Sequence, residues 1–319
     1  MKILITGALG QIGSELTAEL KKNYGEKNIV TSDVREGQIP EEFLPYEKLD
    51  VLDKSRLAEI IKKHDIKVIY HLAAILSAAG EKNHNLCWNV NMTGLHNVLE
   101  MARELNLKQI ICPSSIAVFG PETPRDNTPQ ETVILPKTMY GLTKAAGELL
   151  CDYYVAKFGI DVRGLRYPGL ISYKTLPGGG TTDYAVEIFY EAIRKKSYQC
   201  FLSANTTLPM MYMPDAIRGT IELAEAQFLK LENHSDFNFA GVSFSCAELA
   251  AEIQKHIPDF KITYQPDFRQ KIADSWPRSI DDSTSRKQWG WKVEYDLEKM
   301  VRDMILNLRK KLNGYSTIS

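Results

Sequence analysis

The chain of 319 residues lacks the features that would indicate an extracellular, membrane-spanning or nucleic-acid-binding protein. Its cysteines number only five and are widely scattered, which argues against a disulfide framework and is typical of a reducing compartment. No apolar run approaches the roughly 20 residues of a membrane span, and no cleavable signal sequence is visible. The formal net charge of -1 leaves no basic surplus for nucleic acid or an anionic membrane. We therefore expect a cytoplasmic protein without nucleic-acid or membrane partners.

Metal-binding patterns are missing as well. The sequence has no Cys-x-x-Cys pair and no His-Glu-x-x-His, and its six histidines are dispersed. A structural or catalytic zinc ion would need three or four such ligands close together. We expect no metal site.

Short apolar runs alternate with amphipathic stretches through the first half of the chain. The predicted strands are residues 2–5, 28–32, 68–72, 109–112 and 161–165, and the predicted helices are residues 11–23, 55–63, 82–104 and 138–158. The strands are apolar without alternation, as in a parallel sheet with both faces covered by helices. The pattern predicts an α/β fold with a doubly wound Rossmann sheet.

The second half changes to a mixed α+β pattern. The predicted helices here are residues 183–195, 215–226, 247–256 and 297–312. We expect the Rossmann domain to span residues 1–170 and to be rejoined by about 211–240. Residues 171–210 and 241–319 would then form a smaller lobe.

Three glycines follow the first predicted strand, at Gly7, Gly10 and Gly13. Such glycines let the backbone turn tightly and approach a pyrophosphate at a helix N-terminus, although a simple packing turn could use the same residues. Asp33, about 20 residues later, strengthens the dinucleotide interpretation. Its carboxylate can accept hydrogen bonds from ribose hydroxyls and repels a 2′-phosphate, which favours NAD; Arg35 nearby keeps NADP as the alternative.

Tyr140 and Lys144 lie four residues apart at the start of a predicted helix, and therefore on one face of it. A free tyrosine has a pKa near 10, so about one in a thousand is ionised at neutral pH. A nearby ammonium group stabilises the phenolate. Taken alone, the pair could equally be a surface Tyr–Lys contact. Ser114 and Ser115, which end an apolar strand about 25 residues earlier, favour a catalytic site instead.

Five motifs, in order over residues 1–170, together resemble the extended short-chain dehydrogenase/reductase family. They are T-G-x-x-G-x-x-G at 6–13, H-L-A-A at 71–74, N-V-N-M-T-G at 89–94, S-S-I-A-V-F-G at 114–120 and Y-x-x-x-K at 140–144. The resemblance implies that Ser115 polarises the substrate oxygen, Tyr140 exchanges its proton, and Lys144 tunes Tyr140 and holds the nicotinamide ribose. Phe119 stands where the family often has tyrosine, which puts no catalytic role in doubt.

The resemblance also implies a set of cofactor contacts, with an adenine edge beside Asp50 and Val51. The expected NAD-binding residues are Gly7, Gly10, Gln11, Ile12, Gly13, Asp33, Asp50, Val51, Leu72, Ala73, Ala74, Asn91, Tyr140, Lys144, Tyr167 and Pro168.

Further segments look like one branch of that family, the short-chain L-threonine 3-dehydrogenases. They are residues 75–81, 165–172, 177–185, 208–213, 274–277, 281–283 and 289–291. This resemblance implies metal-independent oxidation of L-threonine at C3 to 2-amino-3-oxobutanoate, with NAD+ as hydride acceptor and Tyr140 as general base. It places the activity in threonine catabolism. The expected substrate contacts are Ser77, Ser115, Tyr140, Gly180, Thr181 and Thr182.

Structural alternatives exist for several of these residues. Ser77 could cap the helix that follows it, and Thr181 or Thr182 could cap the helix predicted from Asp183. Asp183 could serve the helix dipole rather than a substrate ammonium group. Trp276 could wall the pocket or fill the core. The glycines at 178–180 could form a mobile cover or simply turn the chain.

Two other functions compete with the dehydrogenase. An NAD-dependent nucleotide-sugar 4-epimerase would use the same Tyr–Lys chemistry, but needs basic residues in the second lobe to grip a diphosphate; Arg218, Arg269 and Arg278 are available. A non-catalytic NAD-sensing regulator would tend to lose the tyrosine or the lysine, and both are present. The family further implies a homodimer through the helices predicted at 82–104 and 138–158.

Overall fold

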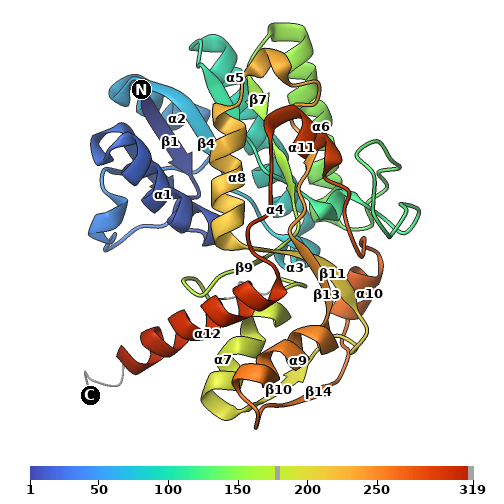
Figure 1. Ribbon diagram of the computed structural model, residues 1–319. Coiled ribbons are helices and arrows are strands. Elements are labelled where there is room, and N and C mark those ends of the chain that lie inside the picture. The colour runs from blue at the N-terminus through green and yellow to red at the C-terminus, as the bar shows by residue number, and fades with distance from the viewer. Residues whose placement is uncertain (177–179, 315–319) are drawn as a thin grey trace.

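A parallel sheet of six strands forms the centre of the larger lobe in this computed structural model, which describes residues 1–176 and 180–314 (Figure 1). In spatial order the strands are β3 (Tyr46–Lys48), β2 (Ile29–Asp33), β1 (Lys2–Thr6), β4 (Ile66–His71), β5 (Gln109–Ile111) and β7 (Val162–Arg163). Every neighbouring pair is parallel. All five residues of β2 are buried, as a strand covered on both faces requires.

Helices cover both faces of this sheet. They are α1 (Gln11–Tyr24) and α8 (Met213–Glu225) on one face, and α2 (Lys54–His64), α5 (Gly94–Glu104) and α6 (Met139–Phe158) on the other. Alternation along β1 explains the two layers: Ile3 and Ile5 join the core formed with α1 and α8, and Leu4 joins the core formed with α2, α5 and α6. The Rossmann prediction is confirmed.

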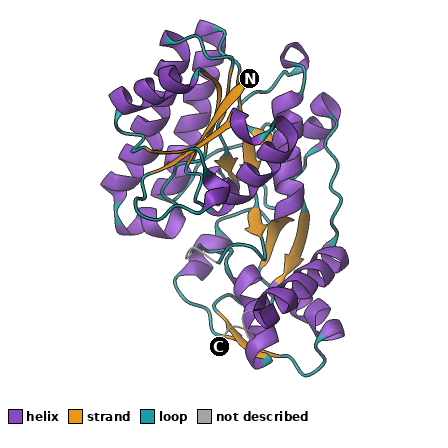
Figure 2. Cartoon of the chain, turned by 90° about the vertical axis from the view of Figure 1, so that its left-hand side faces the viewer, coloured by secondary structure: helices purple, strands orange, loops and turns teal. Residues whose placement is uncertain are grey.

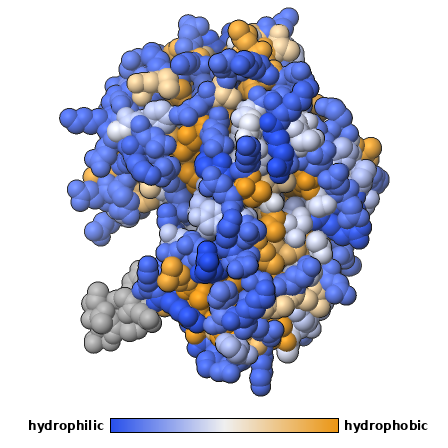
Figure 3. Space-filling model, viewed as in Figure 1, coloured by the Kyte–Doolittle hydropathy of each residue, from blue (hydrophilic) through white to orange (hydrophobic). Residues whose placement is uncertain are grey.

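A second, smaller lobe lies beside the carboxyl edge of the sheet (Figures 1 and 2). Its strands are β9 (Gly169–Ile171), β11 (Thr207–Tyr212) and β13 (Val242–Ser245) in one sheet, and β10 (Ser197–Cys200) and β14 (Lys261–Tyr264) in another. Its helices are α7 (Tyr184–Lys195), α9 (Cys246–His256), α10 (Arg269–Asp274) and α12 (Leu297–Gly314). On the face seen in Figure 3, hydrophilic residues predominate and apolar residues form separate patches. Within the two described ranges, no helix is long and apolar enough to cross a membrane.

A fourth sheet, also parallel, lies between the large sheet and the site. It consists of β6 (Ser114–Ser115), β8 (Leu165–Tyr167) and β12 (Phe237–Asn238), with β8 in the middle. Short 3-10 turns complete the structure at Glu26–Asn28, Glu41–Phe43, Ile116–Val118 and Phe228–Lys230.

Two predicted elements are wrong in detail. The helix expected at 82–104 is four segments: α3 (Ser77–Lys82), α4 (His84–Trp88), a π-helical stretch (Asn89–Thr93) and α5. Asn83 ends α3 and starts a new helix, because its side chain accepts a hydrogen bond of 3.0 Å from the Leu86 N–H.

The strand expected at 161–165 is two strands, β7 and β8, that belong to different sheets. They separate at Gly164, where a Cβ atom would lie 2.4 Å from the Cys112 carbonyl oxygen and 2.5 Å from that of Ser235. The chain bends at this close backbone approach, which only glycine permits.

The chain returns briefly to the larger lobe within residues 241–319, which were expected to belong wholly to the smaller one. At the end of α11 (Ser283–Trp289) and just after it, Trp289 and Trp291 pack on Phe237 and Phe239, in the core that contains α1 and α8. We therefore propose the predicted lobe limits with one addition, residues 283–293, to the Rossmann lobe.

Candidate active site

One continuous crevice runs along the carboxyl ends of β1, β2 and β4. A cavity of about 240 Å³ contains the predicted catalytic residues, and a second of about 420 Å³ extends past Asp33. Gly7, Gly10, Leu72 and Ala74 line both. In open α/β sheets, nucleotides bind at this edge, with the pyrophosphate near the middle.

The glycine turn between β1 and α1 lies at the centre of the crevice. A Cβ atom on Gly13 would lie 2.3 Å from the Gly7 carbonyl oxygen, and Gly7 itself has φ +69° beside the Ala73 backbone. Among the described residues, no side chain caps the start of α1. Gln11 and Ile12 line the cavity at that start. The turn therefore presents a helix N-terminus to an anion, and the absence of side chains at Gly7 and Gly13 lets the backbone form a cradle that fits a pyrophosphate.

Asp33 ends β2 in the second cavity and is almost buried. One carboxylate oxygen accepts from the Leu9 N–H at 3.2 Å, and Arg35 donates to both oxygens at 3.0 and 3.1 Å. Burial alone would raise the pKa of Asp33, but the hydrogen bonds from Arg35 and Leu9 outweigh it and the net pKa is lowered. An ionised acceptor therefore faces the expected ribose position.

Most of the other predicted cofactor residues line one or other of the two cavities, and Asn91 lines neither. Asp50, Val51 and Ala73 line the cavity with Asp33, and Tyr167 and Pro168 line the other cavity. Asn91 lies behind the crevice.

The Asn91 side chain is occupied by the backbone of Ile75. Its Oδ1 accepts from the Ile75 N–H at 2.8 Å, and its Nδ2 donates to the Ile75 carbonyl at 3.1 Å and to Thr143 Oγ1 at 3.0 Å. Asn91 thus supports the wall of the crevice, and a direct cofactor contact remains a prediction.

Ser115, Tyr140 and Lys144 all line the first cavity. Tyr140 is the second residue of α6, and Lys144 lies one turn further, with its Nζ 5.8 Å from the Tyr140 ring centre. Lys144 Nζ donates to the Pro113 carbonyl at 2.6 Å, which ties the helix to the segment before Ser115. The predicted residues are therefore brought together, and their roles remain predictions.

The close approach of α6 to Ser115 depends on Gly141. A Cβ atom there would lie 2.1 Å from the Ala117 carbonyl oxygen, so any larger residue would push the helix away from the turn that follows β6. Thr138 begins the helix, because its side chain accepts from the Gly141 N–H at 3.0 Å. These two residues set Tyr140 beside the serine.

Tyr167 is a second phenol in the cavity. Its hydroxyl shares a short hydrogen bond with Thr220, and burial raises its pKa. A neutral, occupied hydroxyl is a poor proton acceptor, which leaves Tyr140 as the phenol available for proton transfer.

The predicted substrate residues lie at the same cavity, and their alternative roles as helix caps are not realised. Leu76, not Ser77, stands at the N-cap of α3, and Asp183, not Thr181 or Thr182, at the N-cap of α7; no side-chain cap bond forms at either described end. The prediction that α7 begins at Asp183 is one residue early, because Asp183 is the N-cap and Tyr184 the first helical residue. The Asp183 carboxylate accepts a hydrogen bond of 2.6 Å from the Gly180 N–H.

One buried polar residue, Thr181, and one buried apolar residue, Trp276, complete this side of the cavity. Thr181 is 1% exposed, and its Oγ1 has no hydrogen-bond partner within the described ranges. Such an orphan is the kind of atom that a bound ligand satisfies. Trp276 serves both expected roles, since it lines the cavity and packs in the smaller lobe's core. Gly178 and Gly179, expected to turn or cover the site, lie outside the described residues.

His71 lines the cavity and was not predicted to act there, although it begins the H-L-A-A motif. Its Nδ1 lies 2.9 Å from Thr6 Oγ1. Burial, with a smaller contribution from Lys144, lowers the pKa of His71 to about 3. The imidazole is therefore neutral beside Lys144.

A dinucleotide crevice on a Rossmann sheet, with serine, tyrosine and lysine side chains at one end, defines a nicotinamide-dependent oxidoreductase. The sequence pattern of the NAD dependent epimerase/dehydratase family matches residues 3–238. The chain belongs to this family.

Individual proteins resemble the chain over almost its whole length. An uncharacterized epimerase/dehydratase of Staphylococcus saprophyticus is 48% identical over 95% of this chain and 96% of its own. The holo form of a GalE-like L-threonine dehydrogenase from Cupriavidus necator has a TM-score of 0.95 at 54% identity, covering 97% of this chain and 100% of that one. A monomeric L-threonine 3-dehydrogenase from a metagenome, in its apo form, has a TM-score of 0.94 at 52% identity, covering 97% and 99%.

Proposed function

We propose that this protein is an NAD-dependent L-threonine 3-dehydrogenase. It oxidises L-threonine at C3 to 2-amino-3-oxobutanoate and acts in threonine catabolism. The observation that carries the proposal is one cavity that combines Ser115, Tyr140 and Lys144 with the small hydroxyl residues of the second lobe. Similarity to solved L-threonine dehydrogenases over nearly the full chain supports it.

The proposed chemistry assigns each step to a side chain that lines the cavity. The Tyr140 phenolate accepts the proton of the substrate C3 hydroxyl. The Lys144 ammonium favours that phenolate, and the Ser115 hydroxyl donates a hydrogen bond to the reacting oxygen as it gains charge. When bound, NAD+ supplies the hydride acceptor for C3. The products are 2-amino-3-oxobutanoate, NADH and a proton.

The residues around the glycine turn would hold the cofactor. The start of α1 would receive the pyrophosphate, and Asp33 would accept hydrogen bonds from the adenosine ribose. Asp33 supports NAD over NADP because its carboxylate is ionised and already neutralises Arg35, which a 2′-phosphate would need as its partner.

The substrate end of the cavity suits a small polar molecule. Ser77, Thr181 and Thr182 would bind the polar groups of threonine, and the unpartnered Thr181 Oγ1 supports this assignment. Leu76, Ile116 and Trp276 supply apolar wall for its methyl group.

The crevice lining argues against the epimerase. Among its described lining residues, Lys144 and Arg35 are the basic ones. The three arginines that a diphosphate would need are engaged elsewhere: Arg218 with Asp215 and Glu222, Arg269 with Asp267, and Arg278 with Asp126. A nucleotide-sugar substrate would therefore meet few of the charges it requires.

Absorbance at 340 nm tests the proposal. Purified protein with NAD+ and L-threonine should form NADH, and L-serine, L-allo-threonine and NADP+ should give far slower rates. Tyr140→Phe should lower kcat by at least about 1,000-fold, because the general base is removed while the ring remains. No NADH from L-threonine with folded wild-type protein would refute the dehydrogenase, and UDP-sugars would be assayed next.

We further propose a cytoplasmic homodimer. The five cysteines are free thiols, as a reducing compartment favours. Exposed apolar side chains on α4 and α6, the region expected to dimerise, support the assembly: Leu86, Trp88, Leu142, Leu149 and Tyr153.

A further inference from the structure

A buried carboxylate, Glu148 on α6, joins the segments that carry the candidate catalytic groups. Its Oε1 accepts hydrogen bonds from Ser114 Oγ and, at 2.9 Å, from Arg166 Nε; its Oε2 accepts one of 2.8 Å from Arg166 Nη2. The side chains of Glu148 and Arg166 are 5% and 2% exposed. Two parallel N–H···O bonds give such a pair a narrowly defined geometry, so it fixes α6 relative to β6 and β8.

The pairing of β6 with β8 links the Glu148 contact to the position of Ser115 and Tyr167. Ser114 pairs with Arg166, and Ser115 pairs with Tyr167. Successive side chains on a strand point to opposite faces, and the side chains of Ser114 and Arg166 both bind Glu148. Ser115 and Tyr167 line the crevice, which Ser114 also borders. A slip of one residue would reverse both faces.

Lys144 is tied to the same carboxylate along the helix. Glu148 follows it by one turn of α6, so the two side chains lie on one face. A small cavity of about 20 Å³ behind Lys144 is lined by Lys144, Ser114 and Glu148. Glu148 and Lys144 therefore border the same small interior space.

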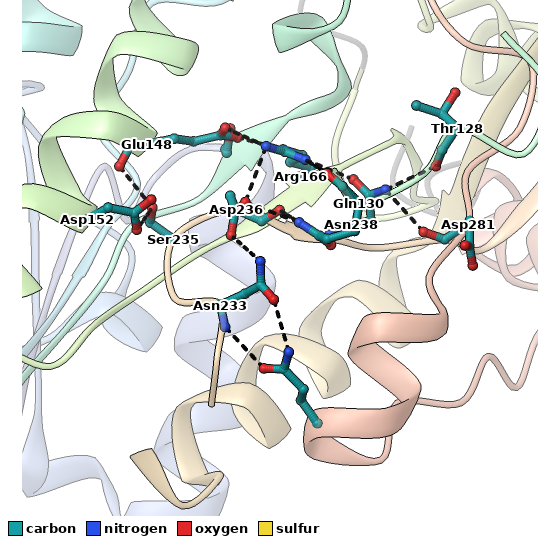
Figure 4. A network of polar contacts seen from close by, with 12 residues as sticks. Thr128, Gln130, Glu148, Asp152, Arg166, Asn233, Ser235, Asp236, Asn238 and Asp281 are labelled. Carbon is teal, nitrogen blue, oxygen red and sulfur yellow. Dashed lines mark hydrogen bonds and ion pairs between the residues drawn. The ribbon is translucent and has the colours of Figure 1, made fainter. Parts of the chain in front are cut away.

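A network of polar contacts surrounds the pair and gives the Arg166 guanidinium further hydrogen-bond partners (Figure 4). Arg166 Nη2 lies 3.4 Å from Asp236 Oδ2, and its Nη1 donates to Asn238 Oδ1 at 3.2 Å and to the Gln130 carbonyl at 3.3 Å. The Gln130 side chain in turn donates to the Asp236 carbonyl at 2.8 Å. A satisfied buried network is rigid, which suits a part that holds others in place.

We propose that the Glu148–Arg166 ion pair is the positioning element of the active site. It sets Ser115 and Tyr167 at a fixed offset from Lys144, and so from Tyr140 on the same helix. Both residues act through these groups and touch no reactant. The inference rests on the proposed function, because that function assigns the chemistry to Ser115, Tyr140 and Lys144.

Two variants test the inference by steady-state kinetics. Glu148→Gln keeps the length of the side chain and loses its charge, and Ser114→Ala removes one contact while leaving the ion pair. We expect kcat for NADH formation to fall about 10- to 100-fold in the first and several-fold in the second, since small misplacements of reacting groups are costly. KM for L-threonine and Kd for NAD+ should change less than about threefold, because the binding residues remain.

Asp161→Asn is the matched control. Asp161 holds the buried Arg163 by the same two-bond arrangement, at 2.7 and 2.8 Å, next to β7 and away from the crevice lining. It should lower the unfolding temperature and leave kcat within about twofold of wild type. Unchanged kcat in folded Glu148→Gln and Ser114→Ala proteins, or an equal loss of kcat in Asp161→Asn, would overturn the proposal.

A failure of the proposed function is distinguishable from a failure of the positioning proposal. If the proposed function is wrong, folded wild-type protein forms no NADH from L-threonine. The positioning proposal is then decided by crystal structures of the NAD+ complexes of wild type, Ser114→Ala and Glu148→Gln. A shift of Ser115 Oγ relative to Lys144 Nζ beyond ~0.5 Å, the tolerance of a working site, supports it; superposition within that tolerance contradicts it.

Discussion

At the scale of single residues, His71 shows how a neutral side chain is kept beside a cation. The ring is 5% exposed, hydrogen-bonded to Thr6, and near Lys144. A protonated imidazole there would face an ammonium group without solvent. The fold therefore carries a histidine that titrates far below its ordinary pKa, and this has a consequence for stability.

Acid should destabilise the protein through His71. Its pKa is about 3 in the folded protein and about 6.5 when unfolded. Between these values the unfolded chain binds a proton that the folded chain does not, so the free energy of unfolding falls as pH drops below about 6.5, by up to roughly 1.4 kcal/mol per pH unit. Denaturant unfolding of wild type and His71→Gln at pH 7 and pH 5 measures it.

The His71→Gln variant is the reference for the wild type, because all other titratable groups contribute equally to the pH dependence of both proteins. The wild type should lose about 2 kcal/mol more than His71→Gln between the two pH values. Equal losses would mean that His71 is not held neutral.

At the scale of elements, the glycine turn before α1 determines whether a nucleotide can bind. Gly13→Ala would place a Cβ atom 2.3 Å from the Gly7 carbonyl oxygen. Because this oxygen belongs to the backbone, the clash can be relieved only by moving the main chain. The turn must open, which moves the start of α1 away from the phosphate position. We expect Kd for NAD+ to rise at least about 100-fold, measured by calorimetric titration.

Ser14→Ala, at the next position on α1, is the comparison. Ser14 Oγ makes only a 3.2 Å contact with the Gln11 carbonyl, so NAD+ affinity should stay within about threefold of wild type. Wild-type affinity in Gly13→Ala protein would show that the turn does not receive the pyrophosphate.

Most elements could be predicted from periodicity, and the exceptions have local causes. The helices of the first half begin and end within two residues of expectation, apart from the region 77–104. There, the predicted helix runs through Asn83, whose side-chain bond to the Leu86 N–H starts a new helix, and a π-helical stretch at Asn89–Thr93 interrupts it again. The split of β7 from β8 depends on Gly164 meeting the backbone of Cys112 and Ser235, residues distant in sequence. Tertiary contacts of this kind leave no periodic signal.

The site residues that belong to short sequence motifs could be predicted, and those that depend on contacts between distant segments could not. The turn and Tyr140 with Lys144 sit in local patterns, and the structure brings them to one crevice. Glu148 looks like an ordinary helix residue in the sequence. Its partners come from β6 and β8, and Arg166 is held further by Gln130 and Asp236 from two separate loops.

At the scale of the whole molecule, one helix serves both the site and an outer surface. The inner face of α6 carries Tyr140, Lys144 and Glu148, and its outer face exposes Leu149 at 73% and Tyr153 at 54%. Single exposed apolar residues are common, but these two lie one turn apart on a helix and near Leu142 on the same face. A second copy of the chain would cover them.

The assembly should therefore depend on α6. The chain has a mass of 36.1 kDa, and we expect light scattering after size-exclusion chromatography to give twice that mass for the wild type. Leu149→Glu places a charge where two copies would meet and should give the single-chain mass, because an unpaired charge is costly to bury in an interface. Leu229→Glu, at a leucine that is 96% exposed on the turn Phe228–Lys230 outside α6, should leave the mass unchanged. A wild type with the single-chain mass would exclude the homodimer and match the metagenomic relative described as monomeric. A dimer that survives Leu149→Glu would place the interface on another surface of the molecule.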